Sequence, residues 1–332
     1  MPKFLIIRFS SIGDIVLTTP VIRCLKKQVK DAEVHFLTKS SFREVIEHNP
    51  YIDKKIYFED NLDAILKQLK SENYNYVIDL HHNLRTFIIK LRLMKKSYSF
   101  NKINFQKWLL VNFKINILPQ KHIVDRYFET VKSFGIENDG AGLDYFISAE
   151  DEKVIQQLPA THQQGYTGFV IGAKHNTKKL PVEKIISICT KINFPIILIG
   201  GKEDFQTAEN IIAASPSSDI RHPTSVFNAC GKFSINQSAA IVKHAHNIIT
   251  HDTGFMHIAA AFKKKIISVW GNTVPEFGMY PYKTGESKFA EVKDLYCRPC
   301  SKIGFDKCPK GHFRCIREID EDQIVKAITQ LP

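Results

Sequence analysis

The 332-residue sequence lacks several features that would assign a function at once. It has no apolar run of about eighteen residues or more, so we expect no membrane-spanning helix. It has neither a glycine-rich dinucleotide fingerprint nor a Walker lysine motif, which removes the usual evidence for hydride transfer and ATP hydrolysis. An arginine-rich tail and a recognisable nucleic-acid-binding module are also missing.

The amino-terminal residues lack the small-residue cleavage site and the long apolar region of a signal peptide. Residues 4–9 instead resemble a first buried strand. We therefore expect a cytoplasmic protein, in which disulfide bonds are disfavoured.

Positive charge is in excess, with a formal net charge of +12. The basic residues are spread along the chain, apart from a modest cluster between Lys90 and Lys96. This excess indicates an anionic partner, and we expect a phosphorylated acceptor or peripheral contact with an anionic membrane surface rather than nucleic acid.

The length suits two domains of about 150 residues. Short apolar runs alternate with helical patterns along the chain, which predicts two doubly wound α/β halves. We assign residues 1–150 to the first half, residues 151–165 to a linker, and residues 166–332 to a second half that closes with a helix. A cleft between the halves is the expected ligand site.

One stretch, from Asn247 to Ala261, predicts a strand, a polar loop and an alanine-rich helix. Thr253 and Gly254 then lie at a helix amino terminus, where free backbone N–H groups favour an anion such as a diphosphate. Asp252 and His257 would flank that anion. The alternative is that Asp252 caps the helix and His257 is a core residue.

Three other loops, residues 10–14, 81–85 and 172–179, are expected beyond the carboxyl ends of strands. Asp14 follows two serines and a glycine at the start of a helical pattern, and it is either a general base or a helix cap. Residues 172–181 form a cationic loop that enters a proline-started helix, and this loop either meets phosphate charge or is solvated.

These loops together resemble glycosyltransferase family 9, the ADP-heptose:lipopolysaccharide heptosyltransferases. The resemblance is carried by three motifs, which follow in order along nearly the whole chain. They are Arg8-Phe9-Ser10-Ser11-Ile12-Gly13-Asp14 with the following Ile15 to Pro20, Lys178-Lys179-Leu180-Pro181, and Asp252-Thr253-Gly254-Phe255-Met256-His257 with the following Ile258 to Ala261.

The resemblance implies the GT-B architecture, with two Rossmann-like domains that face each other across a cleft. It implies an inverting transfer that requires no cofactor and no catalytic metal. Asp14 would deprotonate the acceptor hydroxyl, and Lys178 would neutralise the donor diphosphate. The donor pocket would include Asp252, Thr253, Gly254 and His257.

Other positions match the family pattern less well. Where some members carry a glutamate after a strand, this chain has Lys202-Glu203, and we expect Glu203 near the nucleotide. On the acceptor side, the candidates are Ser11, Gly13, His82, Asn83 and Arg85, with Arg85 able to meet an anionic acceptor.

Four of the seven cysteines cluster within residues 297–315, and the other three are scattered. The cluster consists of Cys297, Cys300, Cys308 and Cys315, with His312 nearby. Four thiols in so short a segment suggest a structural Zn²⁺ site, although reduced, packed thiols are the alternative.

The leading hypothesis is therefore a transferase that moves a heptose or related sugar from a nucleotide donor, expected to be ADP-linked, to a lipopolysaccharide core or similar glycolipid. Another sugar-nucleotide enzyme of the same fold, such as an epimerase, is one alternative. A non-catalytic basic binding protein is the other.

Overall fold

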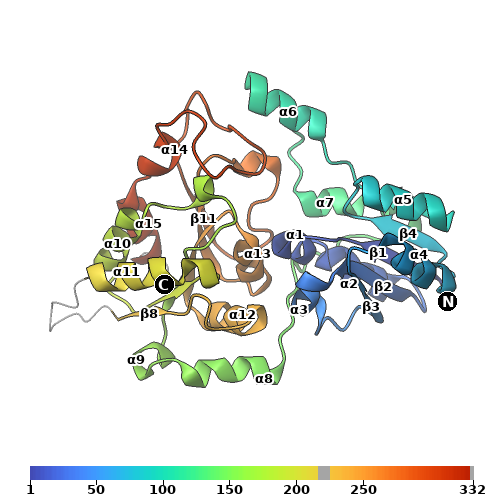
Figure 1. Cartoon of the computed structure of the whole chain (residues 1–332), viewed down its shortest axis with the longest axis horizontal. Helices are drawn as coiled ribbons and strands as arrows, with labels where there is room; N and C mark the ends of the chain where they lie inside the picture. Colours follow the sequence, from blue (N-terminus) through green and yellow to red (C-terminus); the bar gives the residue numbers. More distant parts are fainter. Residues whose placement is uncertain (216–224, 330–332) are drawn as a thin grey trace. The chain divides into compact units, whose positions relative to one another are not determined.

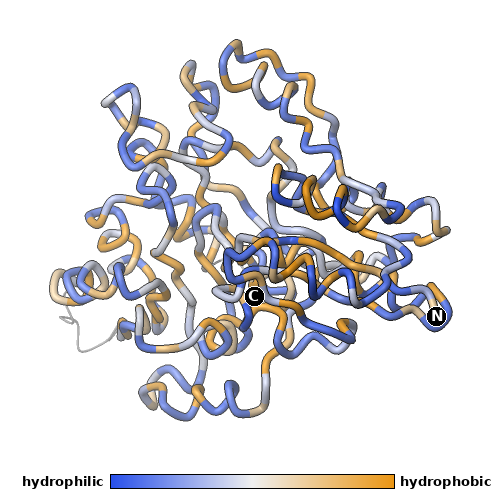
Figure 2. The backbone as a smooth tube through the Cα atoms, turned by 45° about the vertical axis from the view of Figure 1, so that its right-hand side comes forward, coloured by the Kyte–Doolittle hydropathy of each residue, from blue (hydrophilic) through white to orange (hydrophobic). Residues whose placement is uncertain are grey.

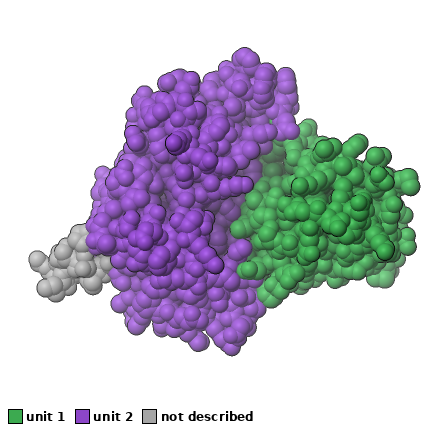
Figure 3. Space-filling model, in the orientation of Figure 1, with its two compact units in different colours: residues 1–103, 121–146 green, residues 104–120, 147–332 purple. Residues whose placement is uncertain are grey.

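Contacts in the computed structural model divide the chain into two compact units, which Figure 3 colours separately. Unit 1 comprises residues 1–103 and 121–146, and unit 2 comprises residues 104–120 and 147–332. The structure describes residues 1–215 and 225–329. Each unit is an α/β domain built around its own parallel sheet (Figure 1).

Unit 1 contains a five-stranded sheet in the order β3-β2-β1-β4-β5, with every neighbouring pair parallel. Phe4, Leu5, Ile6 and Ile7 of the central strand are fully buried, so both of its faces are covered, as parallel sheets require. The strands are β1 (Lys3–Ile7), β2 (Glu33–Lys39), β3 (Lys54–Phe58), β4 (Tyr76–Asp79) and β5 (Lys96–Ser99).

The helices of unit 1 alternate with its strands until β5. They are α1 (Ile12–Val16), α2 (Thr19–Gln28), α3 (Arg43–Ile46), α4 (Leu62–Ser71), α5 (Leu84–Leu93) and α7 (Ile123–Phe128), with short 3-10 turns η1 (Ser40–Phe42) and η2 (Lys132–Phe134).

Unit 2 contains a six-stranded parallel sheet in the order β11-β10-β9-β6-β7-β8. Its central strands are also buried along their whole length. The strands are β6 (Thr167–Val170), β7 (Ile196–Ile199), β8 (Val226–Asn228), β9 (Asn247–His251), β10 (Lys265–Trp270) and β11 (Ser287–Glu291).

Unit 2 also contains α-helices and short 3-10 turns. The α-helices are α6 (Asn104–Phe113), α8 (Ala149–Glu152), α9 (Ala160–Gln163), α10 (Val182–Lys191), α11 (Phe205–Ala214), α12 (Ile235–His244), α13 (Gly254–Ala261), α14 (Arg314–Arg317) and α15 (Glu321–Thr329). The 3-10 turns are η3 (Lys153–Gln157), η4 (Asn176–Lys178), η5 (Lys202–Asp204) and η6 (Pro275–Phe277).

Residues 104–120 leave unit 1 and pack on unit 2. Leu110 lies in an apolar cluster with Val274 and Phe277. Lys114 Nζ donates hydrogen bonds to the backbone oxygens of Cys297, at 3.3 Å, and Pro299, at 2.7 Å. An inserted segment thus contributes both apolar and polar contacts to the unit that follows it in sequence.

Hydrophobic and hydrophilic segments alternate along the described chain (Figure 2). Among residues 1–215 and 225–329, no helix is both long enough and apolar enough to cross a bilayer.

A buried arginine holds the last loop of unit 1 against α2. Arg23, 3% exposed, donates two hydrogen bonds to the carboxylate of Asp139, at 2.7 and 2.8 Å, and pairs with Asp144. A further bond, of 2.9 Å, goes to the backbone oxygen of Gly142. The Arg23 hydrogen bonds lower the pKa of Asp139.

We predict that Arg23→Ala lowers the free energy of unfolding of unit 1 by about 2 kcal/mol at pH 7, because several charge-assisted hydrogen bonds are lost together. The pKa of Asp139 is lower in the folded state, so its contribution is present above the unfolded value of about 3.9 and is lost as the pH falls below it. The difference between wild type and variant should therefore shrink in urea unfolding near pH 3. Lys26→Ala, which removes a more exposed pair with Asp53, should cost less than about 1 kcal/mol, and equal costs for the two variants would contradict the prediction.

Candidate active site

In both units the strand order reverses beside the first strand. The reversal lies between β1 and β4 in unit 1 and between β6 and β9 in unit 2. Chain segments leave the carboxyl ends of these strands in opposite directions, and open α/β sheets bind ligands in the resulting crevice. The segments that follow β1, β6 and β9 carry the three candidate side chains. Asp14 lies in the first turn of α1, Lys178 ends η4, and Asp252 lies between β9 and α13.

An ion pair joins the loops that follow β6 and β9. Lys178 Nζ lies 2.6 Å from Asp252 Oδ2 and 3.2 Å from the backbone oxygen of Asp252. Thr273, in the loop after β10, donates its hydroxyl to the same carboxylate at 2.9 Å. Since β6 and β10 are the two neighbours of β9, three adjacent loops converge on Asp252.

The amino terminus of α13 begins directly after this carboxylate. Its N-cap residue is Thr253, whose side chain makes no capping hydrogen bond. Thr253 Oγ1 is buried and has no hydrogen-bond partner. Asp252 is not the N-cap residue, so the capping alternative for Asp252 is wrong. The first-turn N–H groups of α13, Gly254 included, are not capped by a side chain, and this arrangement suits an oxyanion.

His257 lies in the same helix and is 2% exposed, and its role beside a bound anion stays a prediction. Burial one turn into α13 places it below the anion-binding end of the helix. His251, at the end of β9, is fully buried, and its Nε2 accepts a hydrogen bond from the backbone N–H of Leu180 at 2.9 Å. This bond fastens the cationic loop to β9.

The two lysines of the cationic loop have different partners. Lys179 Nζ lies 2.8 Å from Asp204 Oδ1, and Asp204 also accepts the backbone N–H of Gly201 at 3.0 Å. Asp204 is 4% exposed, whereas Glu203 is exposed. The buried acid after β7 is therefore Asp204, and the role of Glu203 stays a prediction.

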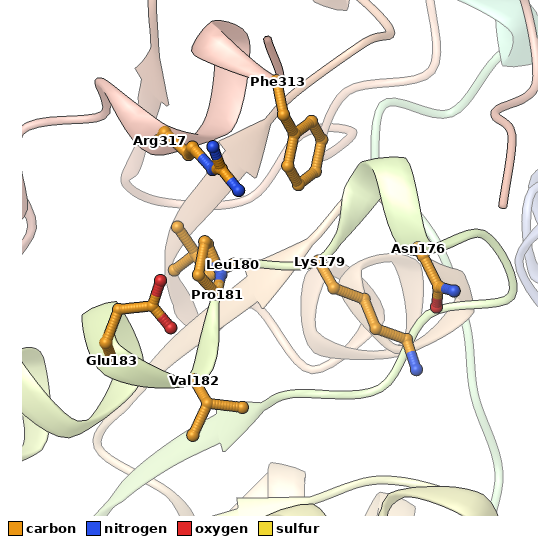
Figure 4. A pocket seen from close by; sticks show the side chains of 8 residues that line it. All are labelled: Asn176, Lys179, Leu180, Pro181, Val182, Glu183, Phe313 and Arg317. Atoms are coloured by element: carbon orange, nitrogen blue, oxygen red, sulfur yellow. The ribbon is translucent and has the colours of Figure 1, made fainter. Parts of the chain in front are cut away.

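A shallow pocket of about 250 Å³ lies beside this loop (Figure 4). Asn176, Lys179 and Pro181 line one side, and Phe313 and Arg317 line the other. Neither Lys178 nor Asp252 borders it, so the pocket is distinct from the ion-pair cluster.

In unit 1, Asp14 is held by a buried arginine. Arg8 Nη2 lies 2.6 Å from Asp14 Oδ1, and Asp14 Oδ2 accepts the hydroxyl of Ser11 at 2.8 Å and its backbone N–H at 3.2 Å. The Asp14 side chain is 21% exposed. Asp14 thus closes a capping box with Ser11, and its side chain remains partly exposed.

Arg8 also ties the β1 loop to the β4 loop. It donates to the backbone oxygens of Ser10, at 2.8 Å, and Leu80, at 2.5 Å, and to the hydroxyl of Tyr127 at 3.2 Å. Burial is the largest influence and opposes the charge of Arg8, but Asp14, Tyr127 and Asp79 together outweigh it, so the pKa of Arg8 is raised. A permanent cation beside Asp14 stabilises its ionised form.

The residues in and just after the β4 loop differ in burial and in their partners. His81 packs edge-on against Phe9, with ring centroids 5.3 Å apart, and burial together with the charge of Arg8 lowers its pKa to about 4. Asn83 caps α5 through its side-chain oxygen, and Arg85 is about half exposed, 3.6 Å from Asp60. No role was predicted from the sequence for His81 or for Arg8, although Arg8 begins the first motif. The two histidines at 81 and 82 are adjacent in the sequence, and Arg8 stands inside an apolar run.

The residues able to bind a metal lie elsewhere. Within residues 1–215 and 225–329, three or more ligand atoms come within 4.8 Å of one another only in Glu33, His35 and Glu72. Lys3 already bridges both carboxylates of this cluster, at 3.1 and 3.3 Å. The cluster lies at or before the starts of the strands, opposite the loop that carries Asp14.

The cysteine cluster is only partly assembled. Cys297 Sγ lies 3.7 Å from His312 Nε2, and Cys297 is also hydrogen-bonded to Cys300. Burial raises the pKa of Cys300 to about 11 and that of Cys315 to about 12, and the neighbouring thiols add to both shifts. All four thiols are free, and the zinc site stays a prediction.

Solved structures share this architecture over nearly the whole chain. The glycosyl transferase family 9 protein from Veillonella parvula DSM 2008 superposes with a TM-score of 0.79 at 22% identity, covering 99% of this chain and 97% of that one. The E. coli heptosyltransferase WaaC with ADP gives a TM-score of 0.69 at 19% identity, covering 99% and 100%. The likeness confirms the expected GT-B class, with two Rossmann-like domains.

Sequence comparison identifies the family. Lipopolysaccharide heptosyltransferase 1 of Campylobacter coli is 27% identical, with 99% of this chain and 98% of that protein covered. The model of glycosyltransferase family 9 (heptosyltransferase) matches residues 63–307. The chain therefore belongs to glycosyltransferase family 9, and the expectation of a glycosyltransferase is confirmed.

We predict that His251 makes the stability of unit 2 pH-dependent. Burial and the charge of Lys179 lower its pKa to about 3. Between that value and the unfolded value of about 6.5, only the unfolded state binds a proton, so stability falls as the pH falls. Between pH 7 and pH 5, protonation of His251 in the unfolded state should lower the free energy of unfolding by about 2 kcal/mol.

The measurement is urea unfolding from pH 7 to pH 5 for wild type, His251→Gln and His244→Gln. His251→Gln should flatten the pH dependence, whatever its cost at pH 7. The variant of the exposed His244 should retain the wild-type slope. If the free energy of unfolding of His251→Gln depended on pH as strongly as that of the wild type, another titrating group would be responsible for the pH dependence.

Proposed function

We propose that this protein transfers a heptose from ADP-heptose to the core of a lipopolysaccharide or a similar glycolipid, with inversion and without a cofactor or a catalytic metal. The observation that supports it best is the convergence of Lys178, Asp252 and Thr273 beside the uncapped amino terminus of α13. The N–H groups at that helix end and the ammonium group of Lys178 would donate hydrogen bonds to a diphosphate.

The choice of sugar and acceptor follows the relatives. Several are lipopolysaccharide or lipooligosaccharide heptosyltransferases, and one similar structure holds ADP-2-deoxy-2-fluoro heptose. For this chain, the donor diphosphate would lie across Thr253 and Gly254. Lys178, with three N–H donors, can contact phosphate oxygens while it keeps its bond to Asp252. His257 and Glu203 would complete the donor pocket.

The acceptor would bind to unit 1, at the loops that follow β1 and β4. The partly exposed side chain of Asp14 would face the acceptor hydroxyl, while Arg8 keeps the carboxylate ionised and fixed in direction. Ser11, Gly13, Asn83 and Arg85 would border the acceptor. Arg85 is the exposed cation of this group and suits an anionic sugar or a phosphate.

The reaction would be a single displacement. Asp14 takes the proton of the acceptor hydroxyl as its oxygen forms a bond to the anomeric carbon. The bond from that carbon to the diphosphate oxygen breaks, and ADP leaves with the electron pair. Lys178 and the amide groups of α13 would stabilise the charge that develops on the leaving group. Attack from the opposite face inverts the anomeric centre.

Nucleotide binding and chemistry should separate by mutation. Asp14→Asn should lower kcat by about 10³-fold, because general-base catalysis is lost, and should keep the thermal stabilisation by ADP. Lys178→Ala should weaken ADP binding at least about tenfold. Lys179→Ala is the matched control, because this neighbouring lysine pairs with Asp204 instead and should largely retain ADP affinity.

The assay would measure transfer with ADP-heptose and a soluble core acceptor, together with thermal shifts with ADP, UDP, GDP and CMP. A shift with another nucleotide alone would overturn the ADP donor. Turnover of ADP-heptose without any acceptor, beyond slow hydrolysis, would favour an epimerase. An Asp14→Asn enzyme with wild-type kcat would remove Asp14 from the chemistry.

A glycolipid acceptor would place the enzyme in the cytoplasm, at the inner face of the inner membrane. The net charge of +12 supports peripheral contact with that anionic surface.

We further propose that the cysteine segment binds one structural Zn²⁺. Between β11 and α14 the described chain has no helix or strand, and a bound metal would stabilise so long an irregular segment. The thiol ligands would be Cys297, Cys300, Cys308 and Cys315. No three of these sulfurs lie within 4.8 Å of one another in the described structure, so zinc binding would require the side chains to move.

The purified protein should then contain close to one zinc per chain by mass spectrometry. Because raised thiol pKa values make deprotonation costly, zinc affinity should rise steeply with pH. Cys308→Ser should release the metal, and Ser301→Ala should keep it. A protein without zinc after reconstitution at pH 8 would leave the cysteines as packed thiols.

A further inference from the structure

Helix α5 in unit 1 is apolar on two faces. One face, formed by Thr86, Ile89 and Leu93, is buried, and its two apolar residues lie in the core of unit 1. The other face is exposed and carries four large apolar side chains. They are Leu84 (74% exposed), Phe87 (57%), Leu91 (62%) and Met94 (86%), the last being the residue that ends the helix.

The exposed residues form a continuous stripe, which we call the α5 stripe. They follow one another at intervals of three, four and three residues, so the helical repeat brings them onto one side. The buried residues follow a similar spacing on the opposite side. Scattered exposed leucines need no explanation, but an aligned row of four large side chains marks an interaction surface.

Basic residues accompany the α5 stripe. Arg85, Arg92 and Lys95 are exposed. The helical repeat places Arg85 and Arg92 on the flank between the α5 stripe and the buried face, and Lys95 directly follows Met94, which ends the helix. Lys90, by contrast, lies 2.8 Å from the buried Asp79 and supports the fold. The sequence between residues 84 and 96 has no aspartate or glutamate. An apolar row with a cationic margin is complementary to an anionic bilayer surface.

The stripe begins where the candidate acceptor loop ends. Asn83 caps α5, and Leu80, in the same loop, accepts a hydrogen bond from Arg8, the partner of Asp14. A membrane surface that bound α5 would therefore also bring the loop beside Asp14 close to that surface. For an acceptor anchored by acyl chains, this is where its sugars emerge from the membrane.

We propose that α5 is a membrane-docking helix, which lays the α5 stripe among the headgroups of an anionic bilayer while Arg85, Arg92 and Lys95 contact lipid phosphates. The purpose of docking rests on the proposed transfer to a glycolipid, but the binding itself does not. An aligned apolar row buried a few ångströms deep and a few basic residues produce reversible attachment.

The experiment is co-sedimentation with vesicles of phosphatidylcholine, with or without phosphatidylglycerol. The wild-type chain should bind the anionic vesicles, and binding should weaken as salt is raised. Phe87→Gln/Leu91→Gln and Arg92→Gln/Lys95→Gln should each reduce the bound fraction at least tenfold. Ile303→Gln, an exposed apolar residue of unit 2 at 55%, is the matched control and should bind as wild type does.

Transfer to a soluble, acyl-free core acceptor separates docking from catalysis. The α5 variants should keep wild-type kcat/KM on it, which also shows that they are folded. Wild-type vesicle binding by both α5 variants, or no vesicle binding by the wild-type chain, would overturn docking. A dimer in the wild-type chain that Phe87→Gln/Leu91→Gln dissociates would instead assign the stripe to a second copy. Vesicle binding without any transfer would leave docking standing and remove the proposed function.

Discussion

The site of unit 2 depends on a single carboxylate that accepts from a side chain on either neighbouring loop. Asp252 takes the amino group of Lys178 on one side and the hydroxyl of Thr273 on the other. Because it is engaged in this way, it does not cap α13, and the positive end of that helix stays available. Unit 1 uses the reverse arrangement, in which the buried cation Arg8 organises the loops and the carboxylate of Asp14 is the exposed member. Both arrangements arise where the strand order reverses, so the topology of the sheets decides which side chains can meet.

Much of the fold could be read from the sequence because buried parallel strands are apolar on both faces. The runs at Phe4–Ile7 and Ile196–Ile199 are examples. The strands that were missed, β5, β8 and β11, lie at the edges of their sheets, where one neighbour is absent and burial is incomplete. Their sequences have no apolar run to detect. Nor does local sequence reveal that residues 104–120 pack on unit 2, because their partners Val274 and Phe277 lie far along the chain.

Candidate site residues could be predicted where they belong to a recognisable motif, as Asp14, Lys178 and Asp252 do. It could not be predicted where the partner has no distinctive local pattern, whether that partner lies on another loop, as Thr273 does, or on the same segment, as Arg8 does. Thr273 and Arg8 carry no local signal, since a threonine after a strand and an arginine within an apolar run have many uses. Adjacent residues were also hard to rank. Asp204, not Glu203, is the buried acid after β7, because only its side chain reaches back to the N–H of Gly201 and to Lys179.

The insertion of residues 104–120 into unit 2 has a consequence for how the protein is made. The chain passes from one unit to the other at three places, after residues 103, 120 and 146. During synthesis, unit 1 can close once residue 146 has left the ribosome, whereas α6 must wait until Val274 and Phe277 have been translated before Leu110 can be covered. For that interval the nascent chain displays an apolar helix between two finished parts of unit 1. A single proteolytic cut in any connection likewise leaves two others intact, so neither unit can be released from the native protein by one cleavage between them.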